Sequence, residues 1–316
     1  MANDSTTGGA TTETIEQTEN AFPYGLAPNG YRLPAETHLG TVHLQIADLE
    51  RSLAWYERVL GLHVAKRTAG SAALTAHDDD KVLVELHQRA GARPVSRRGR
   101  LGLYHYAILL PDRASLGRFL AHLATIGAYA GMSDHFVSEA LYLTDPDGLG
   151  IEVYADRPRS AWRHEGRQLA MATNPLDVDS VIDAAGGERW TGMPKGTVIG
   201  HVHLHVADIP KAEAFYHHGL GLDKVVWSYP GALFLSAGGY HHHLGTNTWA
   251  AEAPRPEDDD ARLLEWTVLV PSVGDAEAAA HSLESGGYTV ARDRDTWVVT
   301  DPWGTNFRIA AENSAG

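Results

Sequence analysis

An internal repeat constrains the fold of this chain more than any other feature of its sequence. Residues 41–62 (TVHLQIADLERSLAWYERVLGL) align without gaps with residues 201–222 (HVHLHVADIPKAEAFYHHGLGL). Each segment opens with alternating residues, a pattern that favours a strand. An Asp then offers a helix N-cap, apolar residues follow at helical spacing, and Leu-Gly-Leu stands where the helix should stop. Each copy therefore predicts a strand followed by a helix.

A second pair of similar segments follows these copies. Residues 103–112 (LYHYAILLPD) match residues 263–272 (LLEWTVLVPS), and each apolar strand precedes a helix-like stretch. Both copies then run into a strand–turn–strand, at 140–156 and 296–312, whose Asp-Pro-x-Gly sequence suits a tight connection. The chain is thus predicted to contain four strand–helix–strands units, in which unit 3 repeats unit 1 and unit 4 repeats unit 2.

The regions outside the repeats differ from them in composition. The first residues are polar, acidic and rich in Thr, so we expect a flexible tail over 1–35. They lack the basic start and apolar run of a signal peptide. Units 1 and 2 are expected to form a domain at 36–156, and units 3 and 4 a domain at 198–316. The connector between them, 157–197, is expected to contain a short helix near 178–185.

Composition narrows the classes of function. A chain of 316 residues with 43% apolar residues is typical of a globular protein with two domains of ordinary size or one large domain. It has no cysteine, so a metal would have to be held by histidine, carboxylate or water. Its net charge of −14 argues against nucleic acid or acidic membranes as partners. No stretch approaches the roughly 20 apolar residues of a membrane helix, and we expect a cytoplasmic protein.

A specific pattern of residues runs through the second unit. It consists of a histidine, a Leu-Tyr pair, an Asp-Pro-x-Gly turn and a glutamate: His135, Leu141-Tyr142, Asp145-Pro146, Gly148 and Glu152. This pattern resembles the extradiol signature of the vicinal oxygen chelate (glyoxalase/bleomycin resistance/dioxygenase) superfamily. The similarity extends over residues 39–312, and it is greatest to the two-domain extradiol dioxygenases of the catechol 2,3-dioxygenase kind. It implies an α+β fold of four βαβββ units that form two cupped mixed-sheet barrels.

The resemblance also implies one complete set of metal ligands. The first ligand of the family lies seven residues before the Asp that starts the helix, and unit 3 has His201 there. The second lies on the first strand of an even-numbered unit, where unit 2 has His105. The third is the glutamate after the Asp-Pro turn, which is Glu152. The expected metal ligands are therefore His105, Glu152 and His201.

The corresponding positions in units 1 and 4 differ from this set. They carry Thr41, Glu265 and Arg308. Because the three ligands are divided between units 2 and 3, neither sequential pairing of units yields a complete site. We infer that unit 2 packs against unit 3 and unit 1 against unit 4, a pairing known in part of the superfamily. In the 1/4 pair we expect Glu265 and Arg308 to form an ion pair instead of binding metal.

Three further residues are expected to act in catalysis. By the resemblance, His135 is the signature histidine, Tyr142 a hydrogen-bonding tyrosine and His242 an acid–base histidine; histidine suits proton transfer near neutral pH. Strand alternation, however, places His241 and His243 on one face and His242 on the other. The sequence leaves open which of these three histidines faces the site.

Other residues are candidates for the wall of the site. His203 and His205 share a strand face with His201 and could line it. Trp227, Phe234 and Trp249 could shape a pocket, although aromatic residues at such spacing more often belong to a core.

The function implied by the resemblance is Fe(II)-dependent extradiol ring cleavage of catechol or a substituted catechol with O2. Two imidazoles and one carboxylate suit non-haem Fe(II), and the same ligands bind Mn(II). Two alternatives remain open from the residues: a metal-dependent glyoxalase-like lyase, isomerase or thiol transferase, and a metal-free protein that sequesters a ligand. The expected partners are a small aromatic diol and O2, with no nucleic acid and no membrane, and a homo-oligomer is compatible with the sequence.

Overall fold

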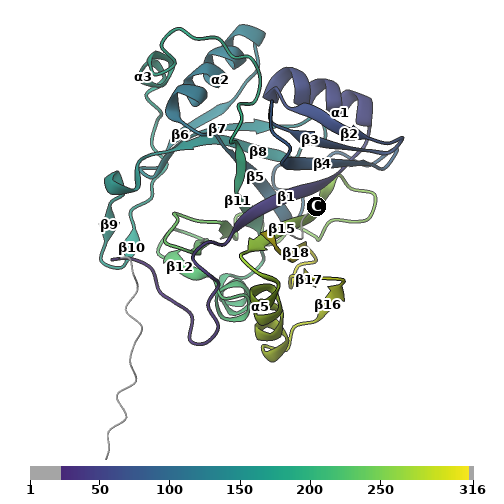
Figure 1. Ribbon diagram of the computed structural model, residues 1–316, viewed down its shortest axis with the longest axis vertical. Coiled ribbons are helices and arrows are strands. Elements are labelled where there is room, and N and C mark those ends of the chain that lie inside the picture. Colours follow the sequence, from purple (N-terminus) through teal and green to yellow (C-terminus); the bar gives the residue numbers. More distant parts are fainter. Residues whose placement is uncertain (1–22, 313–316) are drawn as a thin grey trace, which may run out of the picture.

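Two eight-stranded mixed sheets form the centre of the molecule, and each combines two of the four sequence repeats. The computed structural model describes residues 23–312 (Figure 1). The two sheets lie against each other where β1 packs beside β11 and β15 beside β5. The large hydrophobic core extends across all four units and includes the fully buried Trp266, Tyr56 and Tyr106.

The first sheet joins units 1 and 4 in the strand order β16-β17-β18-β15-β1-β4-β3-β2. Its central pair, β1 and β15, is antiparallel, and His43 lies opposite Glu265 in this pair. The strands of unit 1 are β1 (His38–Ile46), β2 (His63–Arg67), β3 (Ser71–Thr75) and β4 (Val82–Gln88). Those of unit 4 are β15 (Arg262–Val270), β16 (Val290–Asp293), β17 (Thr296–Thr300) and β18 (Asn306–Ala311).

The second sheet joins units 2 and 3 in the order β12-β13-β14-β11-β5-β8-β7-β6. The strands of unit 2 are β5 (Gly102–Leu109), β6 (Gly131–Asp134), β7 (Ser138–Thr144) and β8 (Gly150–Asp156). Those of unit 3 are β11 (Val198–His205), β12 (Asp223–Val226), β13 (Ala232–Ser236) and β14 (Leu244–Asn247). The expected pairing of unit 1 with 4 and of unit 2 with 3 is confirmed.

The helices begin where the repeat predicts them. Asp48 accepts a hydrogen bond from the Arg51 N–H at the start of one helix, and Asp208 accepts one from Lys211 at the equivalent place. Both helices continue as a π-helical turn. The helices are α1 (Leu49–Trp55) with η1 (Tyr56–Leu60), α2 (Arg113–Ile126), α4 (Ile209–Ala212) with η3 (Glu213–Gly219), and α5 (Val273–Ser285).

The connector 157–197 joins units 2 and 3, which belong to the same sheet. Near its end, Met193 forms backbone hydrogen bonds with Gly61 and His77 of unit 1. The short helix expected near 178–185 is present, and it packs against α2. The connector contains η2 (Arg159–Ala161), β9 (His164–Glu165), β10 (Gln168–Leu169) and α3 (Val178–Asp183).

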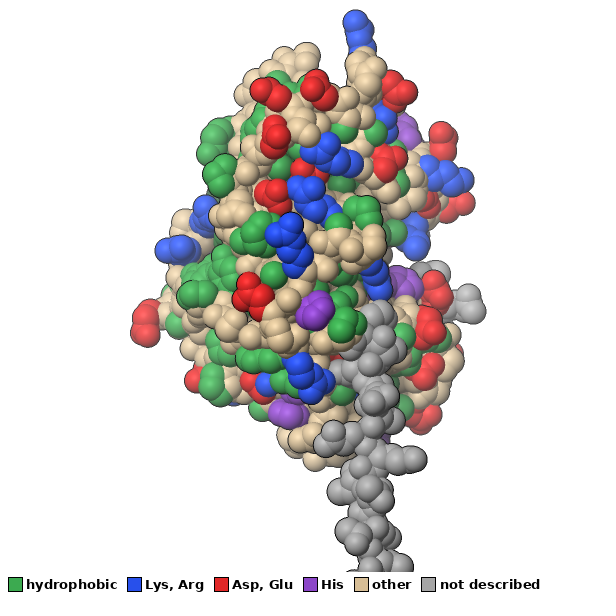
Figure 2. Space-filling model, turned by 90° about the vertical axis from the view of Figure 1, so that its left-hand side faces the viewer, with side chains coloured by type: hydrophobic (Ala, Val, Ile, Leu, Met, Phe, Trp, Pro, Cys, Tyr) green, Lys and Arg blue, Asp and Glu red, His purple; other side chains and the backbone are tan. Residues whose placement is uncertain are grey.

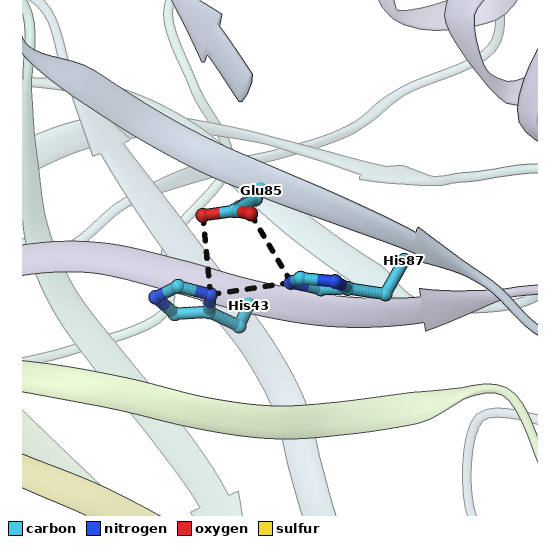
Figure 3. Close-up of side chains that lie close together, drawn as sticks. All are labelled: His43, Glu85 and His87. Atoms are coloured by element: carbon cyan, nitrogen blue, oxygen red, sulfur yellow. Dashed lines mark hydrogen bonds and ion pairs between the residues drawn. The ribbon is translucent and has the colours of Figure 1, made fainter. Parts of the chain in front are cut away.

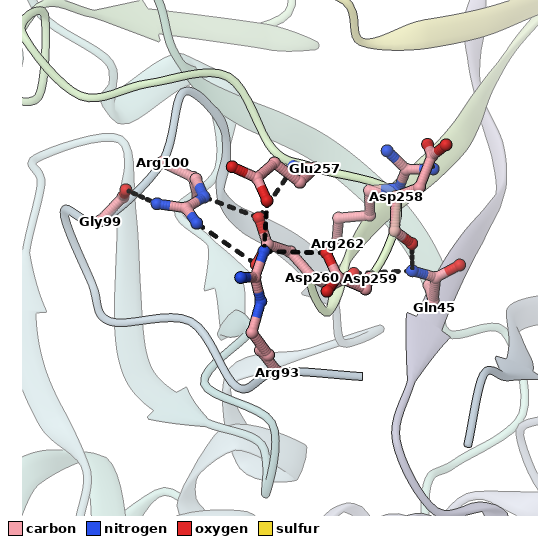
Figure 4. Close-up of polar contacts among 9 residues, drawn as sticks. All are labelled: Gln45, Arg93, Gly99, Arg100, Glu257, Asp258, Asp259, Asp260 and Arg262. Carbon is pink, nitrogen blue, oxygen red and sulfur yellow. Dashed lines mark hydrogen bonds and ion pairs between the residues drawn. The ribbon is translucent and has the colours of Figure 1, made fainter. Parts of the chain in front are cut away.

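Two other connections cross between the sheets and bind each other. Residues 89–101 lead from β4 to β5, and residues 248–261 lead from β14 to β15. The Arg93 guanidinium lies 2.7–2.9 Å from carboxylate oxygens of Glu257, Asp259 and Asp260 (Figure 4). Arg100 Nε donates a hydrogen bond of 2.7 Å to Asp260. This network, with Asp260 buried at its centre, ties the two crossings together.

The segment expected as a flexible tail extends over residues 1–35. Residues 1–22 lie outside the described part of the chain. From residue 23 onward the segment packs against unit 3: Leu26 forms a backbone bridge with Lys224, and Arg32 an ion pair of 2.6 Å with Asp223. This part of the segment is therefore held in place by the second sheet. The domain limits 36–156 and 198–316 remain predictions; each sequence half supplies four strands to each sheet.

The surface mixes charges of both signs. On the face drawn in Figure 2, acidic, basic and apolar side chains are interspersed, so the net charge of −14 is not gathered there into one patch. Within residues 23–312, no helix is long and apolar enough to cross a membrane.

Candidate active site

Three predicted metal ligands meet at the centre of the second sheet. His201, His105 and Glu152 stand on β11, β5 and β8, which are consecutive in the strand order. Their side chains are buried, with exposed fractions of 1%, 4% and 2%. Nε2 of His105 lies 3.0 Å, and Nε2 of His201 3.2 Å, from the same carboxylate oxygen, Glu152 Oε2. The pairing of units 2 and 3 therefore brings the expected ligands together.

The geometry of these donor atoms fits a shared cation. His105 Nε2 is buried and has no hydrogen-bond partner among the described residues, although the Glu152 carboxylate is close to it. A buried polar atom in this state is unfavourable, and a cation beside the carboxylate would remove the penalty. Ligand atoms at right angles on bonds of about 2.1 Å lie about 3.0 Å apart, close to both observed N–O separations.

The ionisation states also suit metal binding. Burial lowers the pKa values of His105 and His201, although the nearby carboxylate partly opposes this effect. Both imidazoles are therefore neutral near pH 7. Burial alone would raise the pKa of Glu152, but the two imidazoles outweigh it and hold this pKa well below its usual range. The set consists of two neutral nitrogen donors and one ionised carboxylate.

A cavity of about 840 Å³ opens over these ligands. His105 and Glu152 line it, and so do the three residues expected to act in catalysis: His135, Tyr142 and His242. The rest of its wall is largely aromatic and apolar. Of the pocket candidates, His203, Phe234 and Trp249 belong to this wall together with Tyr104 and Tyr229. Trp227 does not line the cavity and lies instead beside Lys224.

A hydrogen-bonded pair stands beside the carboxylate. Tyr142 lies opposite Glu152 in the β7–β8 ladder, so its ring is on the same face of the sheet. Its hydroxyl is 2.6 Å from His135 Nε2, and His135 Nδ1 is 2.6 Å from the carbonyl oxygen of Ala172. A carbonyl only accepts, so Nδ1 carries the proton and Nε2 accepts from the phenol. Burial, followed by the Glu152 charge, raises the pKa of Tyr142 well above its ordinary value.

The structure distinguishes the three consecutive histidines that follow β13. His242 lines the cavity, with its ring centroid 4.1 Å from that of His201. His241 does not line the cavity, and its Nε2 lies 2.9 Å from Asp156. His243 Nδ1 accepts a hydrogen bond from the Ala237 N–H. The similarity-based choice of His242 therefore agrees with the position of its ring.

A hydrogen-bonded link connects His242 with the surface. His241 Nε2 donates to the Asp156 carboxylate, which leaves His241 Nδ1 as an acceptor. His242 Nδ1 lies 2.7 Å from that atom and therefore donates to it. Nε2 of His242 is left as the unprotonated nitrogen. Burial, reinforced by the neighbouring imidazoles, lowers the pKa of His242 well below its ordinary value.

Three contributors to the site were not identified from the sequence. Asn247 donates to His203 Nε2 and lies 2.7 Å from His205 Nδ1, so it positions both of these rings. The Ala172 carbonyl and the Asp156 carboxylate fix the histidines described above. Ala172 acts through its backbone carbonyl in the connector, and Asp156 stands at the end of a strand. No sequence pattern indicates a role for either residue. The repeat offset does align Asn247 with His87, and this is the signal that could have revealed it.

The equivalent positions in the first sheet hold an ion pair. Arg308 Nε lies 2.8 Å from Glu265 Oε1, as expected from the sequence. Thr41, at the third position, donates its hydroxyl proton to the Val82 carbonyl. The first sheet thus lacks the ligand set of the second.

Comparisons with known proteins agree with this architecture. The family described as the Glyoxalase/Bleomycin resistance protein/Dioxygenase superfamily matches residues 38–153 and 198–309. A catechol-2,3-dioxygenase of Bacillus subtilis (strain 168) is 45% identical over 271 residues, which are 84% of this chain and 94% of that protein.

Solved structures share the fold at low sequence identity. A protein of Bacillus subtilis subsp. subtilis has a TM-score of 0.60 and 15% identity, over 89% of this chain and 86% of its own. Glyoxalase I from Zea mays has a TM-score of 0.52 and 15% identity, over 88% of this chain and 93% of its own. These similarities confirm the resemblance seen in the sequence, and the chain belongs to the glyoxalase/bleomycin resistance protein/dioxygenase superfamily.

Proposed function

We propose that this chain is an extradiol dioxygenase that cleaves the ring of a catechol-like diol with O2, at one Fe(II) ion held by His105, Glu152 and His201. The observation that carries this proposal is the position of the ligand set. The two imidazoles and the carboxylate of this set lie close together. His105 and Glu152 also line a cavity that contains His135, Tyr142 and His242. The 45% identity with a catechol-2,3-dioxygenase over most of both chains supports it.

The ion would supply a common centre for the diol oxygens and O2, since three protein ligands leave coordination positions open. The chain's own contribution is to position the diol. Tyr104, His203 and Trp249 place aromatic rings around the cavity, with Tyr104 and Trp249 edge-on at 5.6 Å between centroids. A flat aromatic diol matches such a wall in shape and polarity.

The pair of Tyr142 and His135 can take up a proton from the diol. Because the phenol proton is directed to His135 Nε2, the lone pairs of the Tyr142 oxygen are available to a diol hydroxyl. Transfer of the diol proton to this oxygen, with movement of the phenol proton to His135 Nε2, keeps Tyr142 neutral throughout. The Ala172 carbonyl stabilises the resulting imidazolium through Nδ1.

His242 can act on the other side of the site. Its unprotonated Nε2 can accept a proton or a hydrogen bond, while Nδ1 remains bound to His241. Asp156 stabilises positive charge on this histidine pair by accepting from His241 Nε2. Two separate proton acceptors, Tyr142–His135 and His242–His241, thus stand beside one metal position.

The test is the ring-cleavage reaction itself. The protein is loaded with Fe(II) without air, mixed with catechol or a substituted catechol, and then exposed to O2 while oxygen uptake and the yellow ring-opened product are recorded. We expect consumption of one O2 per diol. Parallel loading with Mn(II), and the metal content after native purification, would identify the working ion.

Glu152→Gln is the matched control, since it keeps the size of the side chain but removes its charge. We expect it to remain folded, judged by its melting temperature, and to lose bound iron and activity together. A panel of catechols that yields no ring-opened product with the iron-loaded protein would refute the proposal. Lyase or isomerase activity on a thiol adduct would then favour glyoxalase-like chemistry.

A further inference from the structure

A second group of metal-type ligands lies in the first sheet, outside the candidate active site. It consists of His43 on β1 and of Glu85 and His87 on β4. Figure 3 shows the three side chains converging above the sheet. His43 Nδ1 lies 3.3 Å from His87 Nε2 and 3.5 Å from Glu85 Oε2. His87 Nε2 lies 3.6 Å from the other Glu85 oxygen.

Backbone geometry alone places these side chains together. Glu85 and His87 are two residues apart on one strand, so they project from the same face. His43 lies directly beside Glu85 in the parallel β1–β4 ladder. All three residues belong to strands of the eight-stranded first sheet, so the positions of their backbones are determined by the strand register.

We propose that His43, Glu85 and His87 form a second mononuclear site, which binds a divalent transition-metal ion of the Zn²⁺ type. The donor spacing supports this assignment. In a tetrahedral site with bonds of about 2.1 Å, ligand atoms lie about 3.4 Å apart, close to the 3.3 Å between the two histidine nitrogens. One Glu85 oxygen lies 3.5 Å from His43 Nδ1, and the other lies 3.6 Å from His87 Nε2. Histidine nitrogen and carboxylate oxygen are ordinary zinc ligands, and water would complete the set.

The local charges are compatible with a cation. Burial lowers the pKa of His43, although Glu85 and Glu265 oppose this effect, so its lone pair is available to a metal near neutral pH. Arg308 is the nearby positive group, and its charge is already balanced. Its guanidinium lies 2.8 Å from Glu265 and 2.9 Å from Asp293.

This cluster is not a copy of the candidate active site. The repeat aligns the ligands of that site with Thr41, Glu265 and Arg308, and none of these belongs to the cluster. His43 corresponds instead to His203, and His87 to Asn247, which donates a hydrogen bond to His203 in unit 3. Where unit 3 has a histidine and an amide, unit 1 has two imidazoles and adds Glu85 opposite His43.

An ion can reach the cluster directly from solvent. The side chains of His43, Glu85 and His87 are 26%, 32% and 36% exposed. A bound ion would link β1, at the centre of the first sheet, with β4. The inference goes beyond the proposed dioxygenase function and does not depend on it.

The experiment compares Zn²⁺ binding by the full chain and by the double variant His43→Asn/His87→Asn. The matched control is His63→Asn/His77→Asn, which removes an exposed histidine pair of the same unit with ring centroids 5.8 Å apart. Zinc bound per chain is measured after equilibrium dialysis. We expect the unaltered chain and the control to bind one Zn²⁺ more than the double variant. The candidate active site is present in all three proteins, so zinc bound there contributes equally to the three values and does not affect their difference.

Two further measurements locate the ion. Anomalous scattering at the zinc edge should place it among the three side chains. Glu85→Gln should weaken zinc binding at least about tenfold, the lower end of what loss of a supporting residue causes at metal sites. Equal zinc content in the unaltered chain and a folded double variant, as judged by thermal melting, would overturn the proposal. An anomalous peak only at His105, Glu152 and His201 would overturn it as well.

Discussion

The hydrogen bond between Tyr142 and His135 determines which atoms of these residues can serve a bound diol. His135 is held at Nδ1 by a backbone carbonyl, so the orientation of its ring does not depend on the substrate. The phenol proton is directed toward His135 Nε2. A single hydroxyl thus connects the substrate position with a histidine that can become charged.

Removal of this hydroxyl should slow the reaction without removing the metal. For Tyr142→Phe we expect kcat to fall by about 10²-fold or more, the usual contribution of a positioned proton-transfer group. Iron content should remain that of the unaltered chain, because the hydroxyl is not a ligand. Steady-state kinetics with catechol and metal analysis of the same samples measure both effects.

Tyr104→Phe is the control for this variant. Tyr104 also lines the cavity, but its hydroxyl lies 2.6 Å from Arg97 Nη2, away from the His135 pair. We expect its kcat to change less than about threefold, because the Tyr104 hydroxyl is not hydrogen-bonded to His135 and takes no part in the proposed proton transfer. Equal losses in the two variants would show that the Tyr142 hydroxyl has no special role.

The two Asp-Pro-x-Gly turns are equivalent in the repeat, but they differ in how closely other backbone packs against their glycines. Gly148 and Gly304 occupy the same place in units 2 and 4, with φ angles of +89° and +95°. A Cβ at residue 148 would lie 1.8 Å from the Val95 carbonyl oxygen. At residue 304 the nearest atom would be Arg255 Cδ, at 3.8 Å. Only the turn next to the candidate active site is covered by backbone.

Alanine at these two positions should therefore have unequal effects. Gly304→Ala should lower the free energy of unfolding by about 1–2 kcal/mol, the cost of a left-handed conformation for an L-residue. Gly148→Ala should lose about a further 1–3 kcal/mol, because backbone must move to make room. Urea unfolding of both variants measures the difference. Equal urea midpoints for the two variants would mean that the 89–101 connection can move at Val95 without a cost in stability.

At the scale of the whole molecule, the two sheets are joined by the connections 89–101 and 248–261, which contact each other. Asp260, in the connection 248–261, accepts hydrogen bonds from Arg93 and Arg100 in the connection 89–101 (Figure 4). Burial alone would raise the pKa of Asp260, but hydrogen bonds from Arg100 and the Glu257 N–H hold it below its usual value. Its carboxylate is therefore a pH-dependent contributor to stability.

Asp260→Asn should destabilise the protein by about 1–3 kcal/mol near pH 7, the range for hydrogen bonds to charged groups. Because the folded pKa is lowered, the stabilisation is fully present above the unfolded value of about 3.9 and is lost as pH falls through the folded pKa. Urea unfolding at several pH values should show the difference from the unaltered chain shrinking below about pH 4.

Asp258→Asn is the matched control for this prediction. Asp258 is exposed, and its carboxylate forms an ion pair of 3.0 Å with Arg262, four residues along. Its backbone carbonyl accepts a hydrogen bond from Gln45 Nε2, which the substitution does not remove. Such surface pairs contribute about 0–1 kcal/mol, so this variant should remain close to the unaltered chain at every pH. A pH-independent loss in Asp260→Asn would show that the carboxylate charge is not what holds the crossings together.

The sequence by itself determined the units of this fold and the chemistry available to it. Strand and helix periodicity, the Asp caps and the repeat predicted four similar units, and they occur as expected. These signals are local, so a single sequence carries them. The division of His105, Glu152 and His201 between units 2 and 3 even predicted the pairing of units, because separated ligands can share an ion only in that arrangement.

Only the tertiary structure decided how individual side chains are used. Periodicity could not choose among His241, His242 and His243, because the chain leaves regular strand geometry between β13 and β14. The proton positions on His135 and His241 depend on Ala172 and Asp156, which lie far from them in sequence. The His43, Glu85 and His87 cluster likewise exists only through the register of β1 and β4. Contacts between distant segments depend on packing, which local sequence patterns do not encode.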